Sequence, residues 1–295
     1  MLKLIDVGKM GLCNQLFLCA NIIASAHYRG YKVEYCKFPK VDGIEFSQPE
    51  LNDCISKKEY AFWARHIIKI LKYINWKNER IIQVKGRKDA VKIYVDYIST
   101  GKFRDSTYYF WGWPFLDHMA LRERINLVRE YFSFTQEVKT QAEYILNRGS
   151  KDFIVGCHIR RGDYKYWLDG KYYFPDNIYR RNVDKICENK LQGYKMKVIL
   201  FSNEKISLSE WSSVENYEVI ISSGSTVSEL CAMSMCDLIV GPPSTYSGWA
   251  SLIGNVPKYN IISSEKIYDS SDTFICFYDK DGVGNKYEKL FFDKV

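Results

Sequence analysis

Short apolar runs alternate with segments of helical periodicity through the second half of the chain. Five runs have the length and composition of strands buried inside a sheet, and they lie at 153–157, 197–201, 217–221, 237–240 and 258–262. Helical spacing is seen between them, at 176–190, 226–235 and 245–254. Repeated alternation of strand and helix predicts a mostly parallel sheet covered on both faces.

The beginning of the chain predicts another strand, helix and strand, at 2–7, 14–28 and 32–36, with Gly30 ending the helix. Residues 40–150 are less regular. They predict helices at 59–74, 119–131 and 135–147, a strand or extended segment at 93–99, and an aromatic run without a clear period at 108–114. We therefore expect an α/β protein with two domains, at about 1–150 and 151–295.

Composition favours an intracellular globular protein. Of the 295 residues, 46% are hydrophobic, and the nine cysteines form no C-x-x-C pair or zinc-like cluster. Scattered cysteines within apolar runs are typical of reduced core thiols. No apolar run approaches the length of a membrane-spanning helix. The sequence predicts a cytoplasmic protein, at most peripherally associated with the inner face of the membrane.

The net charge of +7 favours anionic partners in general. Lysine and arginine are spread along the chain and mixed with acidic residues, so no block of basic residues indicates a nucleic-acid-binding arm. We expect no nucleic-acid partner.

A polar cluster directly follows the buried strand predicted at 153–157. Side chains alternate along a strand, so His158 and Arg160 are expected to face the same way. Arg161 would face away and hold the loop, with Asp163 as its expected partner. A guanidinium binds phosphate through paired hydrogen bonds and can neutralise a departing diphosphate. The alternative is a purely structural Arg–Asp pair.

Three segments resemble motifs of the α1,2-fucosyltransferases, glycosyltransferase family eleven, in the family's order. Residues 158–164, His-Ile-Arg-Arg-Gly-Asp-Tyr, resemble the H-x-R-R-G-D-Y signature, whose core is shared by α1,6- and protein O-fucosyltransferases. Residues 11–17 resemble the amino-terminal G-x-G-N-Q-x-F motif, and residues 243–250 the carboxyl-terminal S-[ST]-F-S-x-W-[AG] motif. Residues 200–204 are a weaker match to F-S-D-D. The resemblance spans most of the chain but is poor between about 40 and 150.

The resemblance implies a GT-B fold, in which two Rossmann-like domains face a cleft. The first domain would be on the acceptor side and the second would bind the donor. The implied reaction is inverting transfer of L-fucose from GDP-fucose to an oligosaccharide hydroxyl, with no metal or cofactor. A galactose-terminated acceptor and an α1,2 linkage are expected. The alternatives are another linkage or acceptor, such as α1,6 or protein O-linked fucose, and a non-catalytic nucleotide- or glycan-binding protein.

The family pattern also implies roles for single residues. Arg160 would hold the donor phosphates, with His158 against the nucleotide. Asn14 would reach the diphosphate or fucose from the first domain. Contacts to the β-phosphate would come from Ser244, Thr245 and Ser247.

The last of these roles has an independent physical basis. The strand at 237–240 leads through glycine and two prolines into a helix beginning near Thr245. A helix amino terminus offers free N–H groups and positive potential to a phosphate. Ser244 or Thr245 could equally be the N-cap, and both roles are compatible.

Asn203 and Glu204 follow the strand at 197–201 and would contact the guanine or ribose, although the family usually has two acidic residues there. Cys13 replaces the glycine that the family has before Asn14. Asp163 is the nearest candidate for a general base. Asp279-Lys280-Asp281 fits the metal-binding D-x-D pattern, but a turn is the expected structure there.

Two groups of aromatic residues are candidates for contact with sugars. The run at 108–114 could stack on an acceptor sugar, although core packing is the commoner role of such clusters. The aromatic residues after the main motif are stronger candidates for lining the cleft: Tyr164, Tyr166, Trp167, Tyr172 and Tyr173.

Overall fold

The computed structural model of the chain divides into two compact units, each of which is described by itself. The first comprises Met1–Val41 and Glu45–Ser133, and the second Asp42–Ile44 and Phe134–Lys294. Within them, the structure describes residues 1–6, 10–35, 41–46, 55–57, 81–112, 114–188, 194–212, 216–269 and 272. The helix predicted at 59–74 and the Asp279-Lys280-Asp281 segment lie outside these residues.

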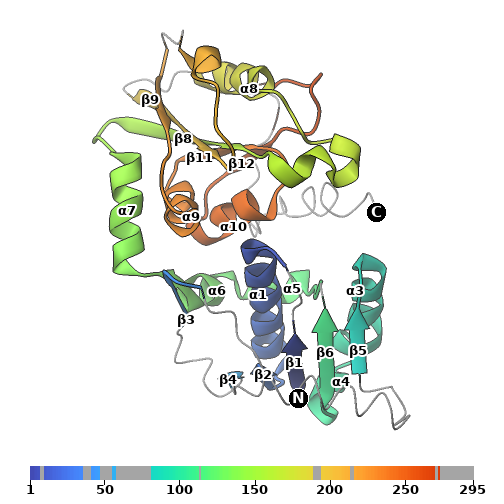
Figure 1. Cartoon of the computed structure of the whole chain (residues 1–295). Coiled ribbons are helices and arrows are strands. Elements are labelled where there is room, and N and C mark those ends of the chain that lie inside the picture. The colour runs from blue at the N-terminus through green and yellow to red at the C-terminus, as the bar shows by residue number, and fades with distance from the viewer. Residues whose placement is uncertain are drawn as a thin grey trace. The chain divides into compact units, whose positions relative to one another are not determined.

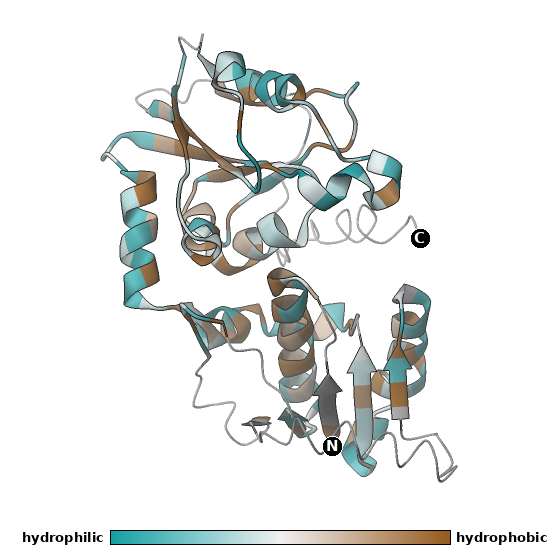
Figure 2. Ribbon diagram, viewed as in Figure 1, coloured by the Kyte–Doolittle hydropathy of each residue, from teal (hydrophilic) through white to brown (hydrophobic). Residues whose placement is uncertain are grey.

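The first unit contains a parallel five-stranded sheet of order β4-β2-β1-β6-β5 (Figure 1). Its strands are β1 (Leu2–Asp6), β2 (Val33–Tyr35), β4 (Ile55–Lys57), β5 (Ile81–Val84) and β6 (Tyr108–Gly112). Helix α1 (Leu12–Arg29) connects β1 to β2 and is hydrophobic over much of its surface (Figure 2). Gly30 ends it in the left-handed conformation, with φ of 70°. The strand, helix and strand predicted here are confirmed.

Two predictions in the first unit need correction. Residues 93–99, predicted as extended, continue helix α3 (Arg87–Ile93) as a π-helical turn at Tyr94–Ile98. The helix predicted at 119–131 is broken at Arg124 into α5 (His118–Glu123) and α6 (Ile125–Tyr131).

Three short elements complete this part of the chain. Helix α4 (Lys102–Asp105) precedes β6, and strands β3 (Ile44–Phe46) and β7 (Phe132–Phe134) pair with each other.

The aromatic run at 108–114 forms strand β6, except that Trp113 lies outside the described residues. Phe110 is fully buried and packs edge-on against Phe115, 5.5 Å between ring centroids. Tyr108 packs against Phe103 in the same way, at 5.4 Å. Core packing therefore accounts for the centre of this run.

The second unit contains a parallel five-stranded sheet of order β10-β9-β8-β11-β12. All five predicted strands are confirmed, as β8 (Asp152–Ile159), β9 (Lys195–Ser202), β10 (Glu218–Ile221), β11 (Leu238–Gly241) and β12 (Lys258–Asn260). The predicted helices are α8 (Asp176–Glu188), α9 (Thr226–Ser234) and α10 (Thr245–Gly254). Helix α7 (Gln136–Leu146), predicted at 135–147, packs against α9.

The two faces of this sheet differ in chemistry. One face packs with α8 into a core of apolar side chains, among them Cys157, Val198 and Val240. The opposite face is covered by α9 and α10 (Figure 1). On that face Gly156 lies against Cys236, and His158 lies against Tyr246. Chain connections change face between β8 and β11, which makes this the topological switch point of the sheet. Ligands of such sheets bind outside the carboxyl ends of the strands at this point.

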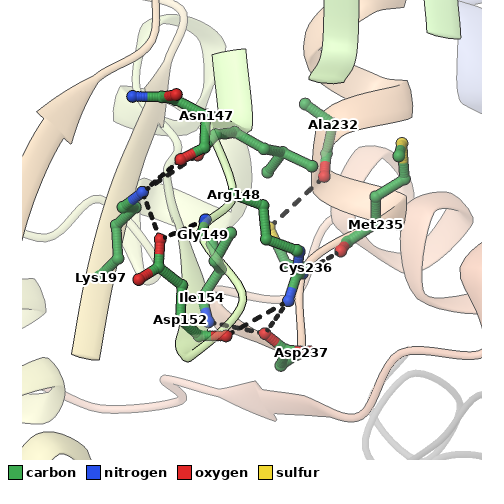
Figure 3. Close-up of polar contacts among 11 residues, drawn as sticks. Asn147, Arg148, Gly149, Asp152, Ile154, Lys197, Ala232, Met235, Cys236 and Asp237 are labelled. Atoms are coloured by element: carbon green, nitrogen blue, oxygen red, sulfur yellow. Dashed lines mark hydrogen bonds and ion pairs between the residues drawn. The ribbon is translucent and has the colours of Figure 1, made fainter. Parts of the chain in front are cut away.

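Two cations tie the opposite, amino-terminal edge of the sheet to the ends of helices (Figure 3). Lys197 pairs with Asp152 at 2.6 Å and donates to the carbonyl of Asn147, just past the end of α7. Arg148 pairs with Asp237 at 2.8 Å and donates to the carbonyl of Met235, just past the end of α9. Positive charge is favourable at helix carboxyl termini, because the carbonyls there lack intrahelical partners.

Six cysteines are buried free thiols, namely Cys13, Cys19, Cys157, Cys187, Cys231 and Cys236. Burial raises the pKa of the Cys19 thiol to about 12, so it stays protonated at neutral pH. In the part of the chain that the structure describes, no helix has the length and hydropathy needed to cross a membrane.

Candidate active site

The loop after β8 places the predicted arginines at the switch point. The strand ends at Ile159, and Gly162 turns the chain with φ of 65°, a conformation that favours glycine. A methyl group on Gly162 would lie 2.8 Å from the Asn203 amide nitrogen. The loop is held from β9: Asn203 accepts from the Arg161 N–H at 2.9 Å, and Glu204 accepts from the Gly162 N–H at 3.0 Å.

Asn203 and Glu204 therefore shape the loop through hydrogen bonds to its backbone. The contact with guanine or ribose that the sequence predicts would be a second role, separate from these hydrogen bonds. Both side chains are exposed, and each keeps further hydrogen-bonding capacity.

The two arginines have different partners from those predicted. Asp163 pairs with Arg160, at 2.6 Å, and not with Arg161. Arg161 pairs with Asp176, at the start of α8, and lies over the ring of Tyr173. The reason is local: Gly162 begins a 3₁₀ turn at Gly162–Lys165, which brings residue 163 back to residue 160.

The Arg160 guanidinium is half-buried and available to an anion. Its side chain is 27% exposed and lies over the ring of Tyr164, 5.2 Å from the centroid. Its buried Nε has no hydrogen-bond partner among the described residues. Because its Asp163 partner is 65% exposed, a bound phosphate can compete with that carboxylate in solvent.

A proline turn joins β11 to α10 beside this loop. The Tyr164 hydroxyl donates to the Pro243 carbonyl at 2.5 Å, which links the arginine loop to the turn. A methyl group on Gly241 would lie 2.5 Å from the His158 carbonyl oxygen, so glycine is needed for β8 and β11 to approach this closely. The Arg160 loop and the start of α10 are thus joined by direct contacts.

The amino terminus of α10 has the features of an anion site. Ser244 is the N-cap, as predicted, and its hydroxyl accepts from the Tyr246 N–H at 3.3 Å. Thr245, the first helical residue, is half-buried. Ser247 is fully buried, and within the described ranges its hydroxyl has no hydrogen-bond partner. Free N–H groups in the first turn and an unused hydroxyl can together bind a phosphate.

His158 is buried beside this turn, with its ring 5.3 Å from that of Tyr246. Its Nδ1 has no partner in the part of the chain described. Burial, and then the positive charges of Lys258 and Arg160, hold the pKa of His158 well below its ordinary 6.5. The imidazole is therefore neutral at pH 7.

This shift predicts a pH dependence of stability. Below pH 6.5 the unfolded chain binds a proton at His158 that the folded protein does not, so the free energy of unfolding falls as the pH drops through that value. We expect His158→Gln to make the melting temperature less dependent on pH between 6.5 and 5. Thermal melts of both proteins across this range would test it, and identical slopes would contradict it.

Sequence reasoning missed two polar residues of β12. Lys258 is fully buried, and Asn260 is nearly so, with neither amide atom bonded to any described residue. Both lie on the α10 face of the sheet, as His158 does. They are in register with Ile239 and Gly241 of β11, whereas the alternate residues Val240 and Tyr259 lie in the core on the α8 face. Each lies within an apolar run, and the only available signal was a polar residue in a predicted buried strand.

Asn14 belongs to the first unit, where it lies half-buried in the first turn of α1. Cys13 is also in this turn and is buried. The position is helical, so it has no need of the glycine that the family motif carries there.

Aromatic residues continue outward from the arginine loop. Trp167 packs on Tyr164 at 4.8 Å between centroids, and Tyr172 packs on Trp167 at 5.6 Å. Tyr166 is 79% exposed. Among the described residues, no group of three His, Cys, Asp or Glu side chains could hold a metal ion.

Comparison with known proteins gives matches in structure only. No protein-family profile matches the sequence, and the search of curated proteins gave no match either. NodZ, an α-1,6-fucosyltransferase in a crystal soaked with GDP-fucose, has a TM-score of 0.56 at 12% identity, over 93% of this chain and 98% of NodZ. Another NodZ structure, from Bradyrhizobium, gives the same TM-score at 13% identity and the same coverage.

Two further solved structures agree. A mutant form of FUT1 from Arabidopsis thaliana, in complex with GDP, has a TM-score of 0.57 at 10% identity, over 91% of this chain and 71% of FUT1. POFUT1 in complex with GDP-fucose has a TM-score of 0.54 at 13% identity, over 88% of this chain and 98% of POFUT1. The chain therefore has the GT-B type of fold that its sequence predicts, built from two Rossmann-like α/β units.

Proposed function

We propose that this protein is a glycosyltransferase that takes L-fucose from GDP-fucose. The observation that carries the proposal is the pairing of a half-exposed arginine with a helix amino terminus at the switch point of a parallel sheet. Both groups bind phosphate, and both lie on the edge where such sheets bind nucleotides. Solved structures with the same fold include the α-1,6-fucosyltransferase NodZ, in a crystal soaked with GDP-fucose and in a crystal grown with GDP.

In this proposal the donor binds to the predicted domain 151–295, almost all of which belongs to the second unit. Arg160 and the first turn of α10, with Ser244, Thr245 and Ser247, hold the diphosphate. Negative charge grows on that group as the fucosyl bond breaks, and Arg160 stabilises it. Neutral His158 lies against the nucleotide, and Arg161 holds the loop through Asp176.

The remaining predicted residues complete the proposal. Asn203 and Glu204 would contact the guanosine while shaping the loop. Asn14, from the acceptor-side domain at 1–150, would contact the diphosphate or fucose. Asp163 would leave Arg160 when phosphate binds, and its freed carboxylate could then accept a proton from the acceptor hydroxyl.

For the acceptor, we propose an oligosaccharide ending in galactose, joined through an α1,2 linkage with inversion at fucose. The motif at 243–250 supports this linkage over α1,6 or protein O-linked transfer. Trp167 and Tyr166 offer exposed ring faces suited to a sugar. A cytoplasmic site of action is supported by the six buried free thiols.

Metal independence is a direct test of this mechanism. We expect transfer of fucose to a galactose-terminated acceptor to proceed at the same rate with and without EDTA, because an arginine supplies the charge on the leaving diphosphate. The measurement is GDP release, with the fucosylated product identified by mass spectrometry and its linkage by NMR. Loss of activity in EDTA that Mg²⁺ restores would contradict the proposed mechanism.

Matched acceptors separate the alternatives. Three acceptors distinguish α1,2 transfer from other linkages. They are lactose, lactose whose galactose 2-hydroxyl has been removed, and a folded protein. GDP binding without transfer to any acceptor and without hydrolysis of GDP-fucose would favour a non-catalytic binding protein.

A further inference from the structure

Lys258 brings an ammonium group to the base of the proline turn. It begins β12, on the face of the sheet that α10 covers, and is fully buried. Its Nζ donates to the Pro242 carbonyl at 3.1 Å. In the ranges that the structure describes, no carboxylate forms an ion pair with it.

A buried ammonium without a carboxylate is costly to keep charged. Burial lowers the pKa of Lys258 from 10.5 to about 7, so a large share of the group is neutral just above neutral pH. Among the described residues, no negative charge acts on Lys258. His158, from β8, is neutral, and both Lys258 and Arg160 act on it as positive charges. On α10, the Tyr246 hydroxyl donates to the Thr226 carbonyl.

The proline turn is held from two sides. Lys258 bonds the Pro242 carbonyl, and Tyr164 bonds the next carbonyl, that of Pro243, at 2.5 Å. Neither proline has an N–H of its own to fix the turn. Immediately after it, Ser244 begins α10, and the Tyr164 ring lies beneath Arg160. These contacts set where the helix amino terminus lies relative to the guanidinium.

We propose that Lys258 is a positioning residue and a buried counter-charge for a nucleoside diphosphate. It holds the Pro242–Pro243 turn and takes up a proton when the diphosphate binds at the start of α10. This inference rests on the proposed function, since it requires a diphosphate at that position.

The proton balance is simple. In the free protein at pH 8, most Lys258 is a neutral amine that still donates one N–H to Pro242. A bound diphosphate adds negative charge nearby and favours the ammonium, so the amine takes one proton from solvent. Binding therefore consumes protons, and affinity falls as the pH rises above 7.

Isothermal titration of the full chain with GDP, at pH 8 in buffers of different ionisation enthalpy, measures this uptake. The phosphate pKa of about 6 lies far below pH 8, so GDP itself contributes little. We expect the wild-type protein to take up a substantial fraction of a proton per GDP. Lys258→Met should show no such uptake and bind about tenfold more weakly, a typical coupling between two sites.

Three comparisons separate this role from a merely structural one. Lys258→Arg keeps its charge at every pH, so it should bind GDP without proton uptake. Lys195→Met removes an exposed cation from β9, which two strands separate from β12, and should leave the uptake unchanged. The third comparison is the pH dependence of the melting temperature without ligand. Because burial lowers the pKa of Lys258 to about 7, the wild-type protein should lose stability as the pH falls from 9 to 7, and Lys258→Met should lose that dependence; a purely structural lysine would leave it in place.

Binding of GDP without proton uptake, or uptake that persists in Lys258→Met, would overturn the role of Lys258 alone. Failure of the wild-type protein to bind GDP would overturn the proposed function as well. If Lys258→Met does not fold, the wild-type proton count and Lys258→Arg decide the question.

Discussion

We expect Arg160→Ala to fold normally and to transfer fucose about 10²–10³-fold more slowly than the wild-type protein, the usual loss when one group that stabilises transition-state charge is removed. The side chain is 27% exposed and its ion pair with Asp163 lies at the surface, so little stability depends on it. The loss should be larger in kcat than in the affinity for GDP-fucose, because charge on the diphosphate grows as the bond breaks.

Steady-state kinetics and GDP titration of the same preparation measure both effects. Arg160→Lys keeps the charge without the paired geometry and should fall between the two proteins. Arg180→Ala is the matched control, because Arg180 pairs with Asp184 on α8, and that helix packs on the other face of the sheet. Near-normal transfer by Arg160→Ala would rule out the proposed chemistry.

The largest expected effect on stability is that of Lys197→Met. The side chain of Lys197 is 4% exposed and that of its partner Asp152 is 9% exposed. Removing the ammonium group takes away the ion-pair partner of the buried Asp152 carboxylate and a hydrogen-bond donor to the Asn147 carbonyl (Figure 3). Breaking a buried pair from one side costs about 3–5 kcal/mol. For a protein of this size, the melting temperature should fall on the order of 10 °C.

Two comparisons sharpen the Lys197 measurement. Lys195→Met, on the same strand but exposed, should leave the melting temperature unchanged. The double variant Lys197→Met with Asp152→Leu should recover much of the loss, because replacing both members of a buried pair is often neutral. A Lys197→Met protein as stable as the wild type would show that the pair contributes nothing.

Secondary structure in the second unit could be predicted because each buried strand has a distinct apolar run and each helix a clear period. Residues 93–99 show why this fails elsewhere. Val95 and Tyr97 favour strands on their own, yet the segment continues α3 as a π-helical turn. There, Tyr97 packs against Phe103 and Tyr108, and this tertiary contact outweighs the local preference.

The candidate site was predicted in outline but not in its pairings. Residue spacing located Arg160 and the start of α10, because both directly follow predicted strands. In the structure Asp163 pairs with Arg160, and Arg161 pairs with Asp176. This depends on the turn at Gly162 and on Asp176, which lies 15 residues beyond Arg161. Lys258 and Asn260 depend on register with β11, which a single sequence does not reveal.

The chain passes between its two units more than once, since Asp42–Ile44 belongs to the second although its neighbours on both sides belong to the first. Thr135 donates its N–H to Gly43 at 3.0 Å, and Val138 packs against the same glycine. Chains are synthesised from the amino terminus, so Asp42–Ile44 leave the ribosome some ninety residues before Thr135 and Val138 do. A fragment beginning at residue 134 would lack them, so neither unit can be obtained intact by a single cut.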